Sequence, residues 1–105
     1  MDITIREATV EDLNGLDILM SYLIDEPVDI EKSKENIEKI HKSSNSKLLI
    51  AFDNDEKIAA GTVYGALIDD YAGNCRPLMV IENVSVLPEY HGNSIGRRLM
   101  DSLEN

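Results

Sequence analysis

The spacing of hydrophobic residues changes along the chain, and each change predicts a different element. Ile3 and Ile5 alternate with polar residues, which indicates a short first strand. Thr9 suits the N-cap of a helix, and the two acidic residues in the first turn after it suit the positive end of the helix dipole. Apolar residues then continue at helical spacing up to Asp25–Glu26–Pro27, where the helix should end: Leu13, Leu16, Met20, Leu23 and Ile24. We expect Met20, Tyr22 and Leu23 to pack in the core rather than to line a substrate groove.

A second helix and a hairpin follow. Asp29 can cap the second helix, which carries isoleucines on one side and charges elsewhere. The polar loop 43–46 leads to an apolar strand over Leu48–Phe52. A polar turn, 53–56, connects it to a longer strand over Ile58–Ile68, and two strands joined by so short a turn form a hairpin. Gly61 and Gly65 in the longer strand predict a bend or a bulge.

The last predicted elements are a strand and a helix. Residues 69–77, which contain Cys75, predict a loop, and Leu78–Val86 predicts a further strand. Pro88 breaks that strand, and Ser94–Leu103 predicts a helix. The order strand, helix, helix, strand, strand, strand, helix indicates an α/β fold. We expect helices flanking a mixed, mostly antiparallel sheet, with one crossover at the end of the chain.

The last strand has apolar residues on both of its faces. Leu78 and Val80 point to one face, and Met79 and Ile81 point to the other. This pattern is typical of a central strand, but the preceding hairpin can pair with only one side of it. An apolar strand with a free edge tends to associate. We therefore expect a homodimer or a larger oligomer in which this strand pairs with another chain.

Composition places the chain among single globular domains. It has 105 residues, of which 43% are hydrophobic, so it is too apolar for a disordered chain and can form one modest core. No apolar run approaches the roughly 20 residues that span a bilayer, and the first residues do not resemble a signal peptide. A single cysteine excludes an internal disulfide. A metal site is also unexpected, because the chain has only two histidines in addition to this cysteine. We expect a metal-free cytoplasmic protein.

The charge of the chain is strongly negative and unevenly distributed. Twenty acidic and ten basic residues give a net charge of -10. A field of that sign repels nucleic acid and anionic lipid, so neither nucleic acid nor a membrane is an expected partner. Acids crowd the stretch from Asp2 to Glu38, whereas the segment from Val84 to Leu99 has one carboxylate, Glu89, and two arginines. An anionic ligand would therefore bind in that segment.

The same segment has the pattern of an anion-binding loop. A strand ending at Val86 is followed by a loop with Gly92 and by a helix with Gly96 and Arg97 in its first turn. Free N–H groups at a helix N-terminus converge on an anion, and glycine lets a ligand come close. Arginine in the first turn opposes the helix dipole, and a bound phosphate would relieve that conflict. Neither a Walker motif nor the dinucleotide fingerprint is present.

The loop resembles the signature of the GNAT superfamily of acyl-CoA-dependent N-acyltransferases. That signature is Arg/Gln-x-x-Gly-x-Gly/Ala, often preceded by Val-x-Pro-x-Tyr. This chain has Val86-Leu87-Pro88-Glu89-Tyr90 followed by His91-Gly92-Asn93-Ser94-Ile95-Gly96, and residues 3–12 are similar to the usual start of the family's domain. Two residues differ, because His91 stands where Arg or Gln is usual and Ser94 stands where Gly is usual.

The resemblance implies an enzyme that transfers an acetyl group from acetyl-CoA to a primary amine. The amine, on a small molecule or a peptide, would attack directly in a ternary complex. Backbone amides of the loop would hold the pyrophosphate of coenzyme A, and the preceding strand would face the pantetheine arm. The implied cofactor-binding residues are Val84, Ser85, Val86, His91, Gly92, Asn93, Ser94, Ile95, Gly96 and Arg97.

Glu82 is the candidate catalytic residue. Glu82-Asn83-Val84 is similar to the acidic pair that some members of the superfamily have at this place. There a carboxylate accepts a proton from the ammonium group of the acceptor, usually through water. An amine must be neutral to attack a thioester, so some base is needed. The alternative is a strand carboxylate that is solvated or paired in a salt bridge.

GNAT domains continue with a further strand and helix after the helix at 94–103. The resemblance therefore implies that residues 1–105 form a single, partial domain. The chain would be a fragment, a naturally short member, or one completed by another chain, and we favour the fragment. Two other functions stay open. One is a non-catalytic module that binds coenzyme A or a protein partner without turnover, and the other is an interaction domain that binds no nucleotide.

Overall fold

The computed structural model describes residues 1–23, 29–68 and 78–104. Every predicted helix and strand is present among them. The predicted helix end at 25–27 and the predicted loop 69–77, with Cys75, lie outside the described residues. The elements are β1 (Ile3–Glu7), η1 (Val10–Asp12), α1 (Leu13–Met20), α2 (Ile30–Lys42), β2 (Ser46–Asp53), β3 (Ile58–Ile68), β4 (Leu78–Val86), η2 (Pro88–Tyr90) and α3 (Ile95–Glu104).

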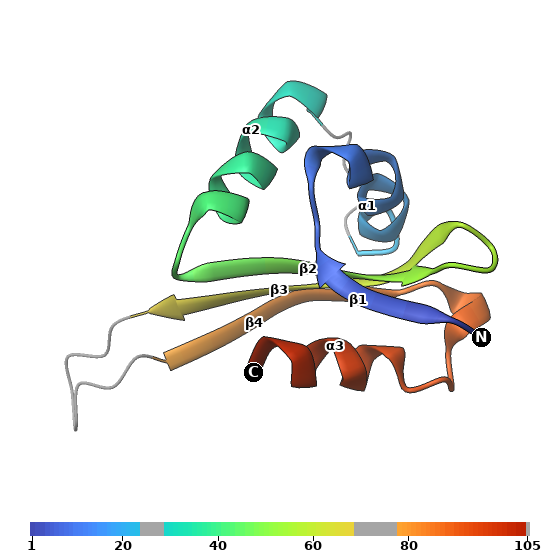
Figure 1. The fold of residues 1–105 in the computed structure, drawn as a ribbon. Helices are drawn as coiled ribbons and strands as arrows, with labels where there is room; N and C mark the ends of the chain where they lie inside the picture. Colours follow the sequence, from blue (N-terminus) through green and yellow to red (C-terminus); the bar gives the residue numbers. More distant parts are fainter. Residues whose placement is uncertain (24–28, 69–77, 105) are drawn as a thin grey trace.

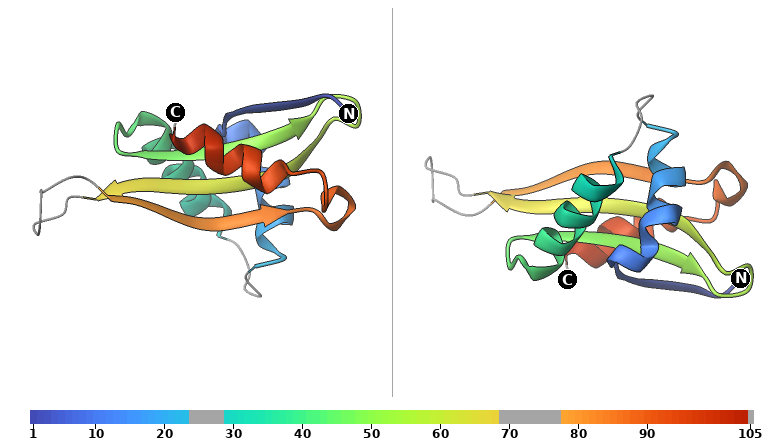
Figure 2. Two further views of the ribbon diagram at one scale, coloured as in Figure 1. Left: turned by 90° about the horizontal axis from the view of Figure 1, so that it is seen from below. Right: turned by 90° about the horizontal axis from the view of Figure 1, so that it is seen from above.

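The four strands form one sheet with helices on both faces. Their order is β1-β2-β3-β4, and each neighbouring pair is antiparallel. Helices α1 and α2 cover one face and α3 lies across the other, as Figures 1 and 2 show. The predicted α/β class is confirmed. The crossover predicted at the end of the chain would need a strand after α3, and the described part of the chain has none.

Two glycines of β3 allow α3 to lie close against the sheet. A Cβ atom at Gly61 would lie 3.1 Å from atoms of Ile95 and Leu99, and one at Gly65 would lie 2.8 Å from Leu103. These three residues of α3 are almost completely buried. The register with β2 shifts beside Gly61 but not at Gly65. The predicted bulge is therefore correct for one glycine only, and both glycines serve the packing of α3.

The first helix is shorter than its apolar spacing predicts. It opens as the 3-10 turn η1, continues as α1 and ends at Ser21, whose N–H and hydroxyl both bond to carbonyls of α1. After Ser21 the helical spacing no longer predicts which side chains are buried. Tyr22 is 57% exposed and Leu23 is 47% exposed, so the expectation of core packing was wrong for both. Leu19 is the fully buried residue of this helix.

The start of η1 is fixed by the carboxylate of Asp12. It accepts a hydrogen bond of 2.8 Å from the N–H of Thr9 and two of 2.9 Å from the guanidinium of Arg6. The same guanidinium lies 5.5 Å from the centre of the Phe52 ring. Burial favours a higher pKa for Asp12, but the bonds from Arg6 and Thr9 outweigh it and hold the pKa below its usual value.

We expect Asp12→Ala to lower the free energy of unfolding by about 2 kcal/mol, because it removes a helix cap and a charged hydrogen-bond pair. Since the folded pKa is lowered, this contribution is present above the ordinary pKa of 3.8 and is lost as pH falls through the lowered value. Urea unfolding at neutral pH and near pH 3 checks this. The difference between wild type and variant should shrink at the acid pH, and a constant difference would contradict the assignment.

Strand β4 lies at the edge of the sheet. Among the described strands it pairs with β3 alone, which agrees with the predicted free edge. Leu78 is 50% exposed and Met79 is 38% exposed, while Leu67 and Ile68 at the end of β3 are also exposed. The apolar pattern of a central strand thus belongs to an edge strand whose first two residues are exposed.

Candidate active site

A bulge in β4 turns two consecutive polar residues toward the face covered by α1 and α2. Tyr64 of β3 pairs with Glu82, and Thr62 pairs with Ser85, so one residue of β3 faces two residues of β4. Asn83 has a φ of 55°, in the left-handed region that asparagine tolerates better than most residues. Residues directly opposite each other share a face, so Glu82 lies on the same face as Tyr64. Both Glu82 and Asn83 are exposed.

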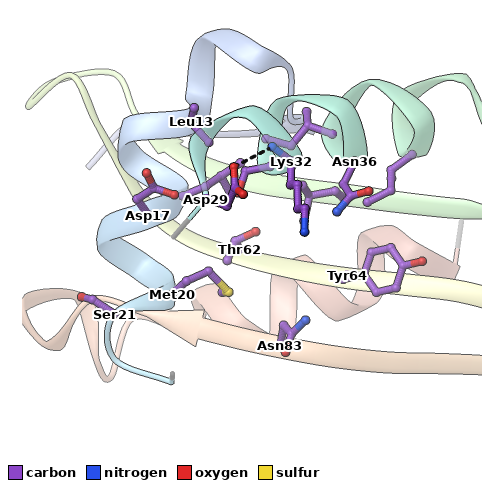
Figure 3. A pocket seen from close by; sticks show the side chains of 15 residues that line it. Leu13, Asp17, Met20, Ser21, Asp29, Lys32, Asn36, Thr62, Tyr64 and Asn83 are labelled. Atoms are coloured by element: carbon purple, nitrogen blue, oxygen red, sulfur yellow. Dashed lines mark hydrogen bonds between the residues drawn. The ribbon is translucent and has the colours of Figure 1, made fainter. Parts of the chain in front are cut away.

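A groove of about 510 Å³ lies on that face, between α1, α2 and the sheet. Figure 3 shows Asn83 and Tyr64 on its sheet side, with Met20 of α1 beside them. Met20 was expected in the core, but it lines this groove. The bulge of β4 therefore faces a cavity large enough for a small molecule or the side chain of a peptide.

The helices add charges to the groove. Asp17 of α1 and Asp29 line it, as does Lys32 of α2, whose side chain points toward the sheet in Figure 3. Asp29 also caps α2, because its carboxylate accepts a hydrogen bond of 3.1 Å from the N–H of Lys32. The predicted cap of the second helix is thus confirmed, and the same carboxylate borders the groove.

The loop between β4 and α3 offers a row of backbone N–H groups. Gly92 has a φ of 89° and Ser94 a φ of 59°, so the chain turns sharply before α3. The carbonyl of Ser94 accepts the first bond of the helix, from the N–H of Arg98. The N–H groups of Gly92 and of residues 94–97 find no acceptor among the described residues. This is the arrangement that binds anions at helix N-termini.

The loop has open space around its glycines. A Cβ atom at Gly92 would have no atom within 4 Å, and one at Gly96 would meet only Cγ2 of Val86 at 3.8 Å. Gly92, Asn93, Ser94 and Arg97 are exposed, whereas Ile95 is buried and anchors the helix in the core. A ligand can therefore approach the N–H groups from solvent.

The other predicted site residues lie beside the loop, and several are already engaged. The hydroxyl of Ser85 is buried and donates to the carbonyl of Leu19 at 2.8 Å. Val84 and Val86 are half-buried and pack against the core below the sheet. The Nε2 atom of His91 lies 3.0 Å from the carbonyl oxygen of Val86 and must donate to it, since a carbonyl can only accept. His91 thus ties the loop to the end of β4.

Sequence reasoning missed one buried polar pair next to the loop. Asp53 was expected in the polar turn 53–56, but it ends β2 and is 3% exposed. It accepts a hydrogen bond of 2.5 Å from the hydroxyl of Tyr90, whose ring is buried in the core. This bond lowers the pKa of Asp53 below its usual value and raises the pKa of Tyr90 to about 12. No local signal marks the pair, because the partners come from distant parts of the chain.

Two negative findings apply to the described ranges alone. Residues 1–23, 29–68 and 78–104 contain no group of three or more His, Cys, Asp or Glu side chains placed to hold a metal ion. Nor does any helix in these ranges have the length and apolar character needed to cross a bilayer.

Comparison with known proteins connects this geometry to a family. The sequence pattern of the acetyltransferase (GNAT) family matches residues 15–105. None of the curated proteins compared with the chain matches it. Among solved structures, glucosamine-6-phosphate N-acetyltransferase from Arabidopsis thaliana superposes with a TM-score of 0.89 at 20% identity, over 99% of this chain and 73% of that one.

Two further structures have the same fold. An acetyltransferase from Trypanosoma brucei has a TM-score of 0.81 at 20% identity, over 97% of this chain and 72% of that one. AAC(6')-Iy, in complex with the bisubstrate analogue CoA-S-monomethyl-acetylneamine, has a TM-score of 0.79 at 20% identity, over 99% of this chain and 70% of that one. The structures establish the shared fold, and the sequence pattern covers most of the chain. The chain belongs to the acetyltransferase (GNAT) family.

Proposed function

We propose that the chain transfers an acetyl group from acetyl-CoA to a primary amine, by direct attack of the amine on the thioester in a ternary complex. The observation that carries the proposal is the course of β4. Its bulge at Asn83 borders the groove, Glu82 directly before the bulge lies on the same face, and the end of the strand leads into the loop of free N–H groups. A polar acceptor and a phosphate-bearing donor would therefore meet along one strand.

The cofactor would lie along the end of β4 and the start of α3. The N–H groups of Gly92 and of residues 94–97 would donate to the pyrophosphate, aided by the positive end of the helix dipole. The exposed Arg97 would add positive charge, while His91 and Asn93 would keep the loop in shape through their bonds to Val86 and Tyr90. The strand segment 84–86 would face the pantetheine arm mainly through its backbone, since its side chains are engaged elsewhere.

Glu82 would act as the general base. The acceptor arrives as an ammonium ion, and Glu82 would take one proton from it, through a bridging water where the distance requires one. The nitrogen lone pair then forms a bond to the thioester carbon, and the bond from that carbon to sulfur breaks with departure of the coenzyme A thiolate. The nitrogen loses its second proton as it becomes an amide, and the departing thiolate takes up that proton to give the free thiol. An exposed carboxylate on the same face as the groove is suitably placed for this exchange.

The amine would enter through the groove between α1 and α2. Asp17 and Asp29 at its border favour a cationic group, as does the net charge of -10. Lys32 would be available for a polar or anionic substituent on the same molecule. We propose a small-molecule or peptide amine as acceptor, and the cytoplasm as the place of action, where a lone cysteine stays reduced.

Two measurements in sequence test the proposal. Calorimetric titration with acetyl-CoA and with desulfo-CoA measures binding, and a thiol-release assay over a panel of primary amines measures turnover. Binding with amine-dependent release supports the acetyltransferase. Binding without release would instead identify a non-catalytic module, and absence of binding would leave only an interaction domain.

We also propose that the free edge of β4 before the bulge, over residues 78–82, pairs with another copy of the chain. Among the described strands β4 pairs with β3 alone, and the start of β4 carries the exposed Leu78 and Met79. The bulge at Asn83 separates residues 78–82 from segment 84–86, so pairing here need not displace the cofactor.

Sedimentation at low micromolar concentration should give a dimer or larger species, and Met79→Lys or Val80→Pro should dissociate it. The first variant adds a charge to the apolar patch, and the second removes a backbone donor. A wild-type monomer in which all amides from Leu78 to Val86 resist hydrogen exchange would contradict the proposal.

A further inference from the structure

Tyr90 holds the start of the loop that connects β4 and η2 to α3 and whose free N–H groups would bind the anion. It is the last residue of η2 and is only 6% exposed, with its ring in the core below the sheet. Its carbonyl oxygen accepts hydrogen bonds of 3.3 Å from both the backbone N–H and the side-chain amide of Asn93. Its own N–H donates to Leu87 at 2.9 Å. The path of the loop after His91 therefore depends on where Tyr90 lies.

Asp53 provides a fixed attachment for the hydroxyl of Tyr90. One carboxylate oxygen accepts the bond from Tyr90, and the other accepts bonds from the N–H groups of Asp55 at 2.9 Å and Glu56 at 3.3 Å. The carbonyl of Asp53 accepts a further bond from the N–H of Lys57 at 2.8 Å. The turn between β2 and β3 thus orients the carboxylate without help from the loop.

Among the described residues, the loop is otherwise attached by the bond from the side chain of His91 to the carbonyl of Val86 and by the start of α3. Gly92 has open space around it, and the far end of the loop is held by the buried Ile95 at the start of α3. Free N–H groups bind an anion well only when they already point to one place, because ordering them on binding costs free energy. Together with the bond from His91 to Val86, the connection from Asp53 to Tyr90 and on to Asn93 supplies that order where the loop begins.

We propose that Asp53 is a positioning residue for cofactor binding, which acts through Tyr90 to hold the loop of free N–H groups in its binding-competent shape. This inference rests on the proposed binding of coenzyme A at that loop. The charge state of the pair is stable over ordinary pH, because the bond lowers the pKa of Asp53 and raises that of Tyr90 to about 12.

Tyr90→Phe tests the inference, since it keeps the ring in the core and removes only the hydroxyl. The dissociation constant for coenzyme A should rise about tenfold, and the KM for acetyl-CoA should rise with little change in kcat. Asp53→Asn should also weaken binding, because the amide oxygen still accepts from the turn but the amide NH2 leaves the Tyr90 hydroxyl only a neutral hydrogen bond in place of a charge-assisted one. The double variant should bind about as well as the weaker single variant, since both changes break one connection.

Two controls separate positioning from general loss of stability. Asp12→Ala destabilises the fold elsewhere and should keep wild-type affinity for coenzyme A. Tyr22→Phe makes the same chemical change at an exposed tyrosine and should also keep it. Wild-type affinity in Tyr90→Phe would overturn the inference and leave the proposed function intact. Absence of binding by the wild-type chain would overturn both. If Tyr90→Phe does not fold, Asp53→Asn decides by the same comparison.

Discussion

Gly96→Val is expected to raise the dissociation constant for coenzyme A about a hundredfold while unfolding stays cooperative. The fold has room for the change, because a Cβ atom at Gly96 would make only an ordinary contact with Val86, at 3.8 Å. A branched side chain in the first turn of α3 would instead obstruct the approach of a pyrophosphate to the N–H groups. Calorimetric titration and thermal unfolding of the same preparation measure both effects.

Ser94→Gly is the matched control in the same loop. The φ of 59° at Ser94 lies in the left-handed region, which costs a residue with a Cβ atom roughly 1 kcal/mol. Glycine avoids this cost and adds no atom that could obstruct the ligand. The affinity of this variant should equal or exceed that of the wild type. Gly92→Val should also lose binding, but its φ of 89° adds backbone strain, which the melting temperature will report. Wild-type affinity in a folded Gly96→Val variant would exclude this loop as the anion site.

Glu82→Gln is expected to lower the rate of acetyl transfer about a hundredfold, with the largest loss at low pH. At low pH the amine is most protonated and depends most on a base, whereas at high pH solvent already supplies the neutral amine. The affinity for coenzyme A should change little, because Glu82 lies before the bulge and the cofactor loop lies beyond the end of β4. The pH dependence of kcat/KM for wild type and variant is the measurement.

Glu38→Gln makes the same change at an exposed position of α2 and should keep the wild-type profile. If Glu82→Gln also keeps it, Glu82 is a solvated strand carboxylate without a part in proton transfer. A uniform loss at every pH, together with weaker cofactor binding, would point to a structural effect instead.

The elements were predictable where one apolar repeat matches one continuous piece of backbone. Ile95, Leu99 and Leu103 repeat at helical spacing, and all three are buried along α3. Leu23 continues the repeat of the first helix as well, but the backbone there is no longer α-helical, because the N–H groups of Tyr22 and Leu23 bond three residues back instead of four. Hydrophobic spacing predicts burial only as far as the backbone stays regular, and a tightened last turn leaves a weak trace in sequence.

The part of the site that lies in one continuous segment could be predicted from the sequence. The part that depends on how strands and helices pair could not. The loop from His91 to Gly96 is one continuous segment, so its glycines and its place before a helix can be read directly. The bulge at Asn83 depends on register, because it appears only when Tyr64 pairs with Glu82. An asparagine among strand residues was its one local sign. The groove likewise needs α1 and α2 to lie on the same face of the sheet with a space between them.

Titration of isotope-labelled protein with coenzyme A, followed at each backbone amide by nuclear magnetic resonance, tests the central claim that the loop between β4 and α3 binds the cofactor. The amide signals of Gly92 and of residues 94–97 should shift most and saturate together. Smaller shifts are expected along 84–86, and the amides of α2 should stay unchanged. Shifts concentrated in the groove between α1 and α2, with the loop amides unmoved, would contradict the claim, as would no shift at all.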